Sequence, residues 1–86
     1  MVLGVLKYEG LIIPFQLVRA NEAYDYDLER IISNEITFYD LEGRNAATLE
    51  FDNEKICKKV YNQIWYNISH DKKYFDLDKL DLKTGQ

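Results

Sequence analysis

The fold is decided by the segment Ile36–Ser69, ITFYDLEGRNAATLEFDNEKICKKVYNQIWYNIS. Apolar and polar side chains alternate over residues 36–39 and again over residues 46–51, which is the period of a half-buried β-strand. The six residues between these runs include the Asp, Gly and Asn types that turns favour. The segment therefore predicts a β-hairpin with Phe38 opposite Leu49 and both side chains on the inner face.

The second half of the segment predicts an amphipathic helix over residues 53–69, because its apolar residues recur at helical spacing. Asp52 is the predicted N-cap, and Glu54 suits the positive end of the helix dipole. The apolar stripe consists of Ile56, Cys57, Val60, Tyr61, Ile64, Trp65 and Ile68. We expect this stripe to cover the sheet, because lysine and amide side chains occupy the opposite side of the helix.

The N-terminal segment predicts another hairpin, because two β-rich runs, residues 3–8 and 11–18, flank the dipeptide Glu9-Gly10. Glycine supplies the positive φ of a tight turn, and a two-residue loop places Tyr8 opposite Leu11. The face that this pairing is expected to bury consists of Leu6, Tyr8, Leu11, Ile13, Phe15 and Leu17.

The middle of the chain carries an alternating apolar and acidic run, Tyr24–Glu29, which favours a half-buried strand. In such a strand Asp25, Asp27 and Glu29 would share one face. Apolar residues within 22–32 also fall at helical spacing, so a helix is the alternative. The strand is the expected structure.

The expected fold class is α+β: an antiparallel β-meander of four to five strands covered by one C-terminal amphipathic helix, residues about 53–69. The expected domain organisation is a single domain, residues 1–86, because a chain of 86 residues has room for one compact core. The tail should dock as a short strand or turn of helix through Phe75, Leu77, Leu80 and Leu82. The order of strand, turn, strand and helix over Ile36–Ile68 resembles the closing half of pleckstrin-homology-like domains. This resemblance is in the order of the elements and involves no residue motif.

The charge is unevenly distributed along the chain. The net charge is −4, but residues 20–54 carry ten acids against two arginines, whereas residues 55–73 carry five lysines against one acid. A net acidic domain is poorly suited to direct nucleic-acid binding, which depends on neutralising phosphates. The single cysteine allows no intramolecular disulfide, and the first residues lack a basic signal-peptide flank. A cytoplasmic location and no membrane contact are therefore expected.

Catalytic and cofactor chemistry is not expected. Cys57 is the only thiol and His70 the only histidine, too few for a zinc site or a nucleophile with its base. We expect Cys57 to be a buried helix residue and His70 to cap the C-terminus of the helix. The phosphate-binding motifs GxGxxG and GxxxxGK[ST] are absent from the sequence. The sequence thus predicts a protein that is not an enzyme, with no cofactor and no metal.

The candidate partner-binding residues lie in three places. The acidic strand face offers Asp25, Asp27 and Glu29, and the polar side of the helix offers the aromatic residue Tyr66. Aromatic side chains of this kind are enriched at protein interfaces. The third group, in the loop of the second hairpin, consists of Asp40, Glu42 and Arg44.

Three hypotheses of function follow. The first is a small non-enzymatic module that acts by contact with another protein. The alternative is an acidic, phage-type inhibitor that mimics nucleic-acid charge and blocks a basic groove on a nucleic-acid-binding partner. The third is a metal-assisted hydrolase that uses Asp25, Asp27 and Glu29. The sequence makes no prediction of oligomeric state.

Overall fold

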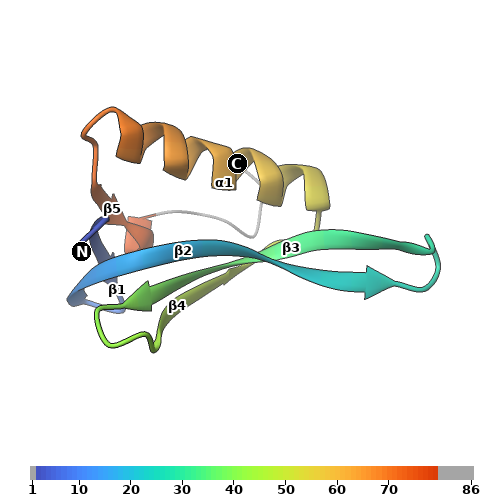
Figure 1. The fold of residues 1–86 in the computed structure, drawn as a ribbon, viewed down its shortest axis with the longest axis horizontal. Helices are drawn as coiled ribbons and strands as arrows, with labels where there is room; N and C mark the ends of the chain where they lie inside the picture. Colours follow the sequence, from blue (N-terminus) through green and yellow to red (C-terminus); the bar gives the residue numbers. More distant parts are fainter. Residues whose placement is uncertain (1, 80–86) are drawn as a thin grey trace.

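The computed structural model describes residues 2–79, which form one five-stranded sheet with a single α-helix across one face (Figure 1). The α+β class is confirmed. The elements are β1 (Gly4–Tyr8), β2 (Leu11–Asp25), β3 (Arg30–Asp40), β4 (Asn45–Glu50), α1 (Glu54–Ser69), β5 (Tyr74–Asp76) and a 3₁₀ turn, η1 (Leu77–Lys79).

The sheet is mixed rather than purely antiparallel. Its order is β4-β3-β2-β1-β5, so the first four strands form the expected meander, while β5 pairs parallel with β1. The predicted C-terminal position of the helix is wrong, because α1 lies in the middle of the chain and connects the two edge strands. Sixteen helical residues span about 24 Å, enough to cross the roughly 19 Å between the outer strands of a five-stranded sheet.

The tail docks as a strand followed by a 3₁₀ turn, as expected for residues 74–79. Phe75 and Leu77 are buried in the core. The carboxylate of Asp78 accepts hydrogen bonds from the backbone N–H groups of Glu9 (2.7 Å) and Gly10 (3.0 Å), which ties the tail to the first turn. Leu80 and Leu82, also predicted to dock, lie outside the described residues.

The first hairpin has the predicted register, with Tyr8 opposite Leu11. Glu9 and Gly10 both have positive φ, 51° and 78°, as a type I′ turn requires.

The predicted buried face of β2 is correct only in part. A bulge between Phe15 and Leu17 reverses the alternation of the strand, so Val18 is buried and Leu17 is exposed. Leu11 is also exposed, at the turn.

The second hairpin forms, but its predicted register is wrong by two residues. Phe38 pairs with Ala47 rather than with Leu49. The pairing moves because β3 continues to Asp40, which shortens the loop, and a bulge follows Phe38. Phe38 and Leu49 still lie on the buried face, because a shift of two residues preserves the side-chain alternation.

The helix begins one residue later than its predicted cap. Asn53, not Asp52, is the N-cap, and its side-chain oxygen accepts from the backbone N–H of Lys55 (2.7 Å). The predicted apolar stripe is confirmed, with Cys57 and Ile64 buried and its other members packed against the core. The buried core consists of Leu6, Phe15, Val18, Ile36, Phe38, Ala47, Leu49, Phe51, Cys57, Ile64, Phe75 and Leu77.

Candidate interaction site

Residues 22–33 form a two-stranded arm that extends beyond the body of the protein (Figure 1). β4 pairs with β3 only over residues 35–39, and β1 pairs with β2 only up to Phe15. Within the described residues, the strands of the arm therefore pair only with each other. Arg30, the first residue of β3 after the turn, connects the far end of the arm to the helix, because its guanidinium lies 3.5 Å from the Glu54 carboxylate. Glu54 also pairs with Lys58 at 3.2 Å, within α1.

The predicted strand over residues 24–29 is confirmed only to Asp25, where β2 ends and a turn over residues 26–29 begins. The helical alternative is wrong. The shared strand face is wrong too, because Asp27 and Glu29 lie in the turn, where Glu29 has a positive φ of 51°. The Asp25 carboxylate accepts from the backbone N–H of Asp27 (2.9 Å) and of Leu28 (3.2 Å). Asp25 therefore stabilises the turn, while Asp27 and Glu29 are exposed.

The loop residues Asp40, Glu42 and Arg44 form a separate group. The Asp40 carboxylate accepts from the backbone N–H groups of Glu42 and Arg44, each at 2.9 Å, so it shapes the loop. Glu42 and Arg44 are exposed and form an ion pair with each other. This loop and the turn of the arm lie at opposite ends of β3, whose eleven residues span about 33 Å. The two acidic groups do not form one site.

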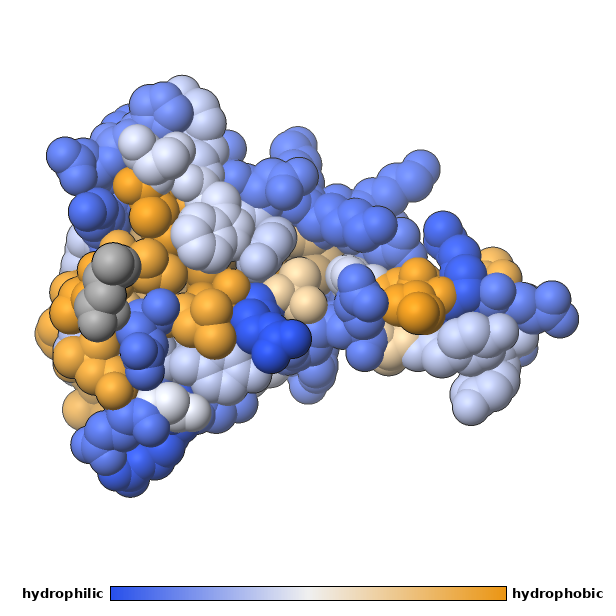
Figure 2. Space-filling model, viewed as in Figure 1, coloured by the Kyte–Doolittle hydropathy of each residue, from blue (hydrophilic) through white to orange (hydrophobic). Residues whose placement is uncertain are grey.

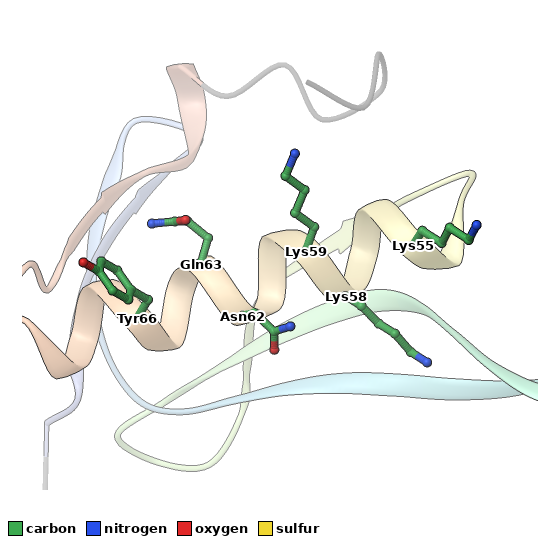
Figure 3. Close-up of a pocket in the computed structure, with 6 residues that line it drawn as sticks. All are labelled: Lys55, Lys58, Lys59, Asn62, Gln63 and Tyr66. Carbon is green, nitrogen blue, oxygen red and sulfur yellow. The ribbon is translucent and has the colours of Figure 1, made fainter.

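Tyr66 lies on the outer side of α1 and is exposed, as predicted. It borders a shallow hollow of about 620 Å³ whose other lining residues are Lys55, Lys58, Lys59, Asn62 and Gln63 (Figure 3). Its ring stacks on His70, with ring centroids 4.0 Å apart. His70 caps the helix as predicted, and its Nδ1 lies 2.8 Å from the Tyr66 carbonyl oxygen. Because a carbonyl oxygen can only accept, Nδ1 is the donor.

The prediction from sequence missed the feature that distinguishes the arm. Four large apolar side chains are exposed at its end: Tyr24 (50%), Tyr26 (84%), Leu28 (56%) and Ile31 (61%). The rings of Tyr24 and Tyr26 pack edge to face, 4.8 Å between centroids. Figure 2 shows the arm as a narrow projection with hydrophobic residues on its surface. We call residues 24–31 the arm tip.

A signal for the arm tip was present in the sequence. The period-two pattern assigned Tyr24, Tyr26 and Leu28 to a buried strand face, but no sequence pattern shows whether a second layer reaches that face. Two large apolar residues inside a turn, Tyr26 and Leu28, are the unusual feature, because turns normally favour small and polar residues.

A groove lies between the base of the arm and the helix. Its volume is about 420 Å³, and it is lined by Arg19, Ala20, Glu22, Ser33, Lys58, Tyr61 and Asn62. The hydroxyl of Tyr61 donates to the backbone carbonyl of Val18 (3.3 Å) at this groove. Figure 3 shows Lys58 and Asn62 extending from α1 on the side that lies over the strands.

Two features bear on chemical function. Burial raises the pKa of the Cys57 thiol, and the nearby carboxylates of Glu35 and Glu54 raise it further. Residues 2–79 contain no group of three His, Cys, Asp or Glu side chains placed to hold a metal ion. The hydrolase hypothesis depended on three acids sharing one strand face, which the arm does not have.

The comparisons with known proteins assign the chain to no family. Neither protein-family models, nor curated proteins, nor solved structures give a significant match to the chain. The likeness to pleckstrin-homology-like domains therefore has no support from these comparisons. Along residues 2–79, no helix is both long enough and apolar enough to cross a membrane.

Proposed function

We propose that the protein is a non-enzymatic protein-interaction module that binds another protein through the arm tip. The exposed apolar cluster of Tyr24, Tyr26, Leu28 and Ile31 carries this proposal. Apolar surface that is concentrated on a projecting element, rather than scattered singly, is typical of interaction sites. Tyrosine is also among the residues that most often supply binding energy at interfaces. The proposed location of the protein is the cytoplasm.

The chemistry of the partner follows from the rim of the arm tip. Asp27 and Glu29 are exposed beside the apolar side chains, and Glu22 lies on the neighbouring part of β2. A complementary partner presents an apolar pocket for the aromatic rings with lysine or arginine around its edge. The arm is narrow, so it fits a cleft better than a flat surface.

The inhibitor hypothesis is the second candidate, and one observation favours it. Asp27 and Glu29 are both exposed in the turn of the arm, where they can enter a basic groove. The acids of the distant Asp40 loop do not extend this charge, because they lie at the other end of β3. The two candidates differ in salt dependence: a charge mimic loses affinity steeply as salt rises, whereas an apolar anchor does not.

The test compares variants of the arm tip with matched variants elsewhere. The immobilised protein captures partners from an extract of its source cells, mass spectrometry identifies them, and the purified partner is titrated against each variant. Tyr26→Ala and Leu28→Ala remove apolar anchors. Tyr66→Ala and Leu41→Ala are the controls, because they remove the same residue types from other exposed positions.

We expect the arm-tip variants to weaken binding by more than about tenfold and the controls to leave it unchanged. Circular dichroism checks that all four variants are folded. Loss of binding in Tyr66→Ala, with full binding in Tyr26→Ala, would place the interface on the helix and refute the proposal. If Asp27→Lys with Glu29→Lys abolishes binding at low salt while Tyr26→Ala has no effect, the inhibitor hypothesis is favoured instead.

A further inference from the structure

The arm leaves one side of β2 open. β1 ends opposite Phe15, whereas β2 continues for ten more residues, 16–25, along β3. In the part of the chain that the structure describes, no strand pairs with β2 on the β1 side of these ten residues. We call residues 16–25 of β2 the free edge.

The backbone of the free edge is oriented toward the open side. The Val18 carbonyl accepts from the Tyr61 hydroxyl on α1, so it points away from β3. In an antiparallel ladder, the N–H and C=O of alternate residues point to the same side. The register shift after Asn21 places its extra residue, Asn34, in β3, so β2 keeps its alternation. The backbone groups of Ala20, Glu22 and Tyr24 therefore point away from β3 as well, and Ala20 and Glu22 also line the groove beside α1.

Such a row of backbone donors and acceptors defines its ligand, an extended polypeptide strand. We propose that the ligand is a second copy of this protein, with the free edges of two copies paired antiparallel about a two-fold axis. A two-fold interface requires a surface that is complementary to itself. An open strand edge meets this requirement in its backbone, because two identical strands in antiparallel arrangement exchange the same hydrogen bonds.

The side chains of the free edge are also complementary to themselves. Glu22 is an acid on the edge, while Arg19 and Lys58 are cations lining the groove beside it. In a pairing with Glu22 of one copy opposite Ala20 of the other, each Glu22 carboxylate enters the groove of the neighbouring copy. The two-fold axis makes this contact twice. The alternative register, with Glu22 opposite Glu22, places like charges together and is disfavoured.

The pairing also covers apolar surface. Leu17 and Tyr24 are exposed on the free edge in a single copy. A two-stranded ribbon is marginally stable in water, and pairing of two arms converts it to a four-stranded sheet at the interface. The free edge shares Tyr24 with the arm tip, but the pairing needs neither Tyr26 nor Leu28, so Tyr26→Ala and Leu28→Ala test the proposed function without removing the groove contacts tested here.

The experiment is sedimentation velocity over a range of protein concentrations, combined with charge reversal. For the wild type, we expect the mass to rise with concentration from 10.2 kDa toward twice that value. Glu22→Lys places a third cation in the groove, and Arg19→Glu places a second acid there. Each variant alone should dissociate at concentrations about tenfold or more above those of the wild type.

Mixing the two variants is the decisive step. In the mixed dimer, the lysine of Glu22→Lys faces the new glutamate of Arg19→Glu. The unchanged Glu22 of the second variant faces the unchanged Arg19 of the first. Both contacts of the mixed dimer are attractive, so we expect the mixture to dimerise where neither variant does alone. Misfolding cannot produce this result. The backbone part of the proposal is checked by hydrogen exchange, in which the amides of Ala20 and Glu22 should gain protection as the wild type associates.

Three outcomes would overturn the proposal. The first is a wild type that sediments at the mass of a single chain at every concentration. The second is a mixture of Glu22→Lys and Arg19→Glu that stays monomeric although the wild type dimerises. The third is dimerisation without protection of the Ala20 and Glu22 amides, which would place the contact on another surface.

Discussion

Replacement of Phe38 by alanine tests the core most directly. The Phe38 side chain has no exposed surface and lies on β3, in the core that the sheet forms with the helix. Its ring packs edge to face on Phe15, 5.1 Å between centroids at 81°, and is tilted against Phe75 at 6.4 Å. The three rings join β2, β3 and β5. A truncation at Phe38 therefore removes contacts to two other strands.

The magnitude follows from this packing. A buried Phe→Ala change costs about 3–5 kcal/mol, and the loss of an edge-to-face partner favours the upper half of that range. A domain of this size has a free energy of unfolding of about 5–15 kcal/mol in total. At about 4–8 °C per kcal/mol, the melting temperature should fall by at least about 12 °C. The cavity cannot collapse easily, because strands on both sides of Phe38 fix the backbone.

Urea denaturation, followed by circular dichroism and by the fluorescence of the single tryptophan, Trp65, measures the change. We expect the midpoint to fall while the slope with urea stays the same, because both proteins expose similar surface on unfolding. Tyr26→Ala is the control, since an exposed aromatic of the arm tip should change stability by no more than about 0.5 kcal/mol. A loss of less than about 1.5 kcal/mol for Phe38→Ala would refute the packing described for the three rings.

Four further predictions concern other positions. The buried Cys57 thiol should react with a thiol reagent far more slowly in the native protein than in denaturant, and equal rates would show that the helix is rotated from its assigned position. The pKa of the Cys57 thiol is raised above its ordinary value of 9.0, so the folded protein keeps the thiol proton at a pH where the unfolded chain has lost it. The stability of the wild type should therefore fall relative to that of Cys57→Ala as the pH rises above 9.0. Asn53→Ala should cost about 1 kcal/mol in thermal unfolding and Asp52→Ala clearly less, and the reverse order would reassign the cap. Gly4→Ala should destabilise the protein and weaken the docking of β5, since the new Cβ would clash with the backbone carbonyl oxygen of Lys73; amide exchange in β5 no faster than in wild type would contradict this.

Local patterns predicted the local structure well. The helix, the two-residue turn at Glu9-Gly10 and the inward positions of Phe38 and Leu49 each depend on spacing within a few residues. The prediction of Asp52 as N-cap was wrong because Asp and Asn side chains can both accept from the first turn of a helix, and the sequence does not show which residue adopts the cap conformation.

The failed predictions concern events between distant segments. The bulge after Phe15 exposes Leu17, and the bulge after Phe38 changes the pairing with β4. Neither bulge can be recognised from the alternation of apolar and polar residues in the sequence. The parallel pairing of β5 with β1 depends on where the helix ends relative to the sheet. The exposure of the arm tip depends on where the helix stops covering the sheet. The acidic residues could be identified from the sequence as candidates, but their separation by the length of β3 could not.

The crossover from β4 to β5 has a consequence for the order in which the protein folds during its synthesis. Strands β1 to β4 can pair as soon as each leaves the ribosome, because every pairing closes a short loop. The outer side of β1 is paired only later, because its partner β5 lies far along the chain. The hydrogen bond from the Glu9 N–H to the Asp78 carboxylate, for example, joins residues 69 positions apart. Closing so long a loop is entropically costly and slow compared with hairpin formation. Until residues 74–79 arrive, the nascent chain therefore exposes β1 as an unprotected strand, and this interval is when the protein is most vulnerable to aggregation.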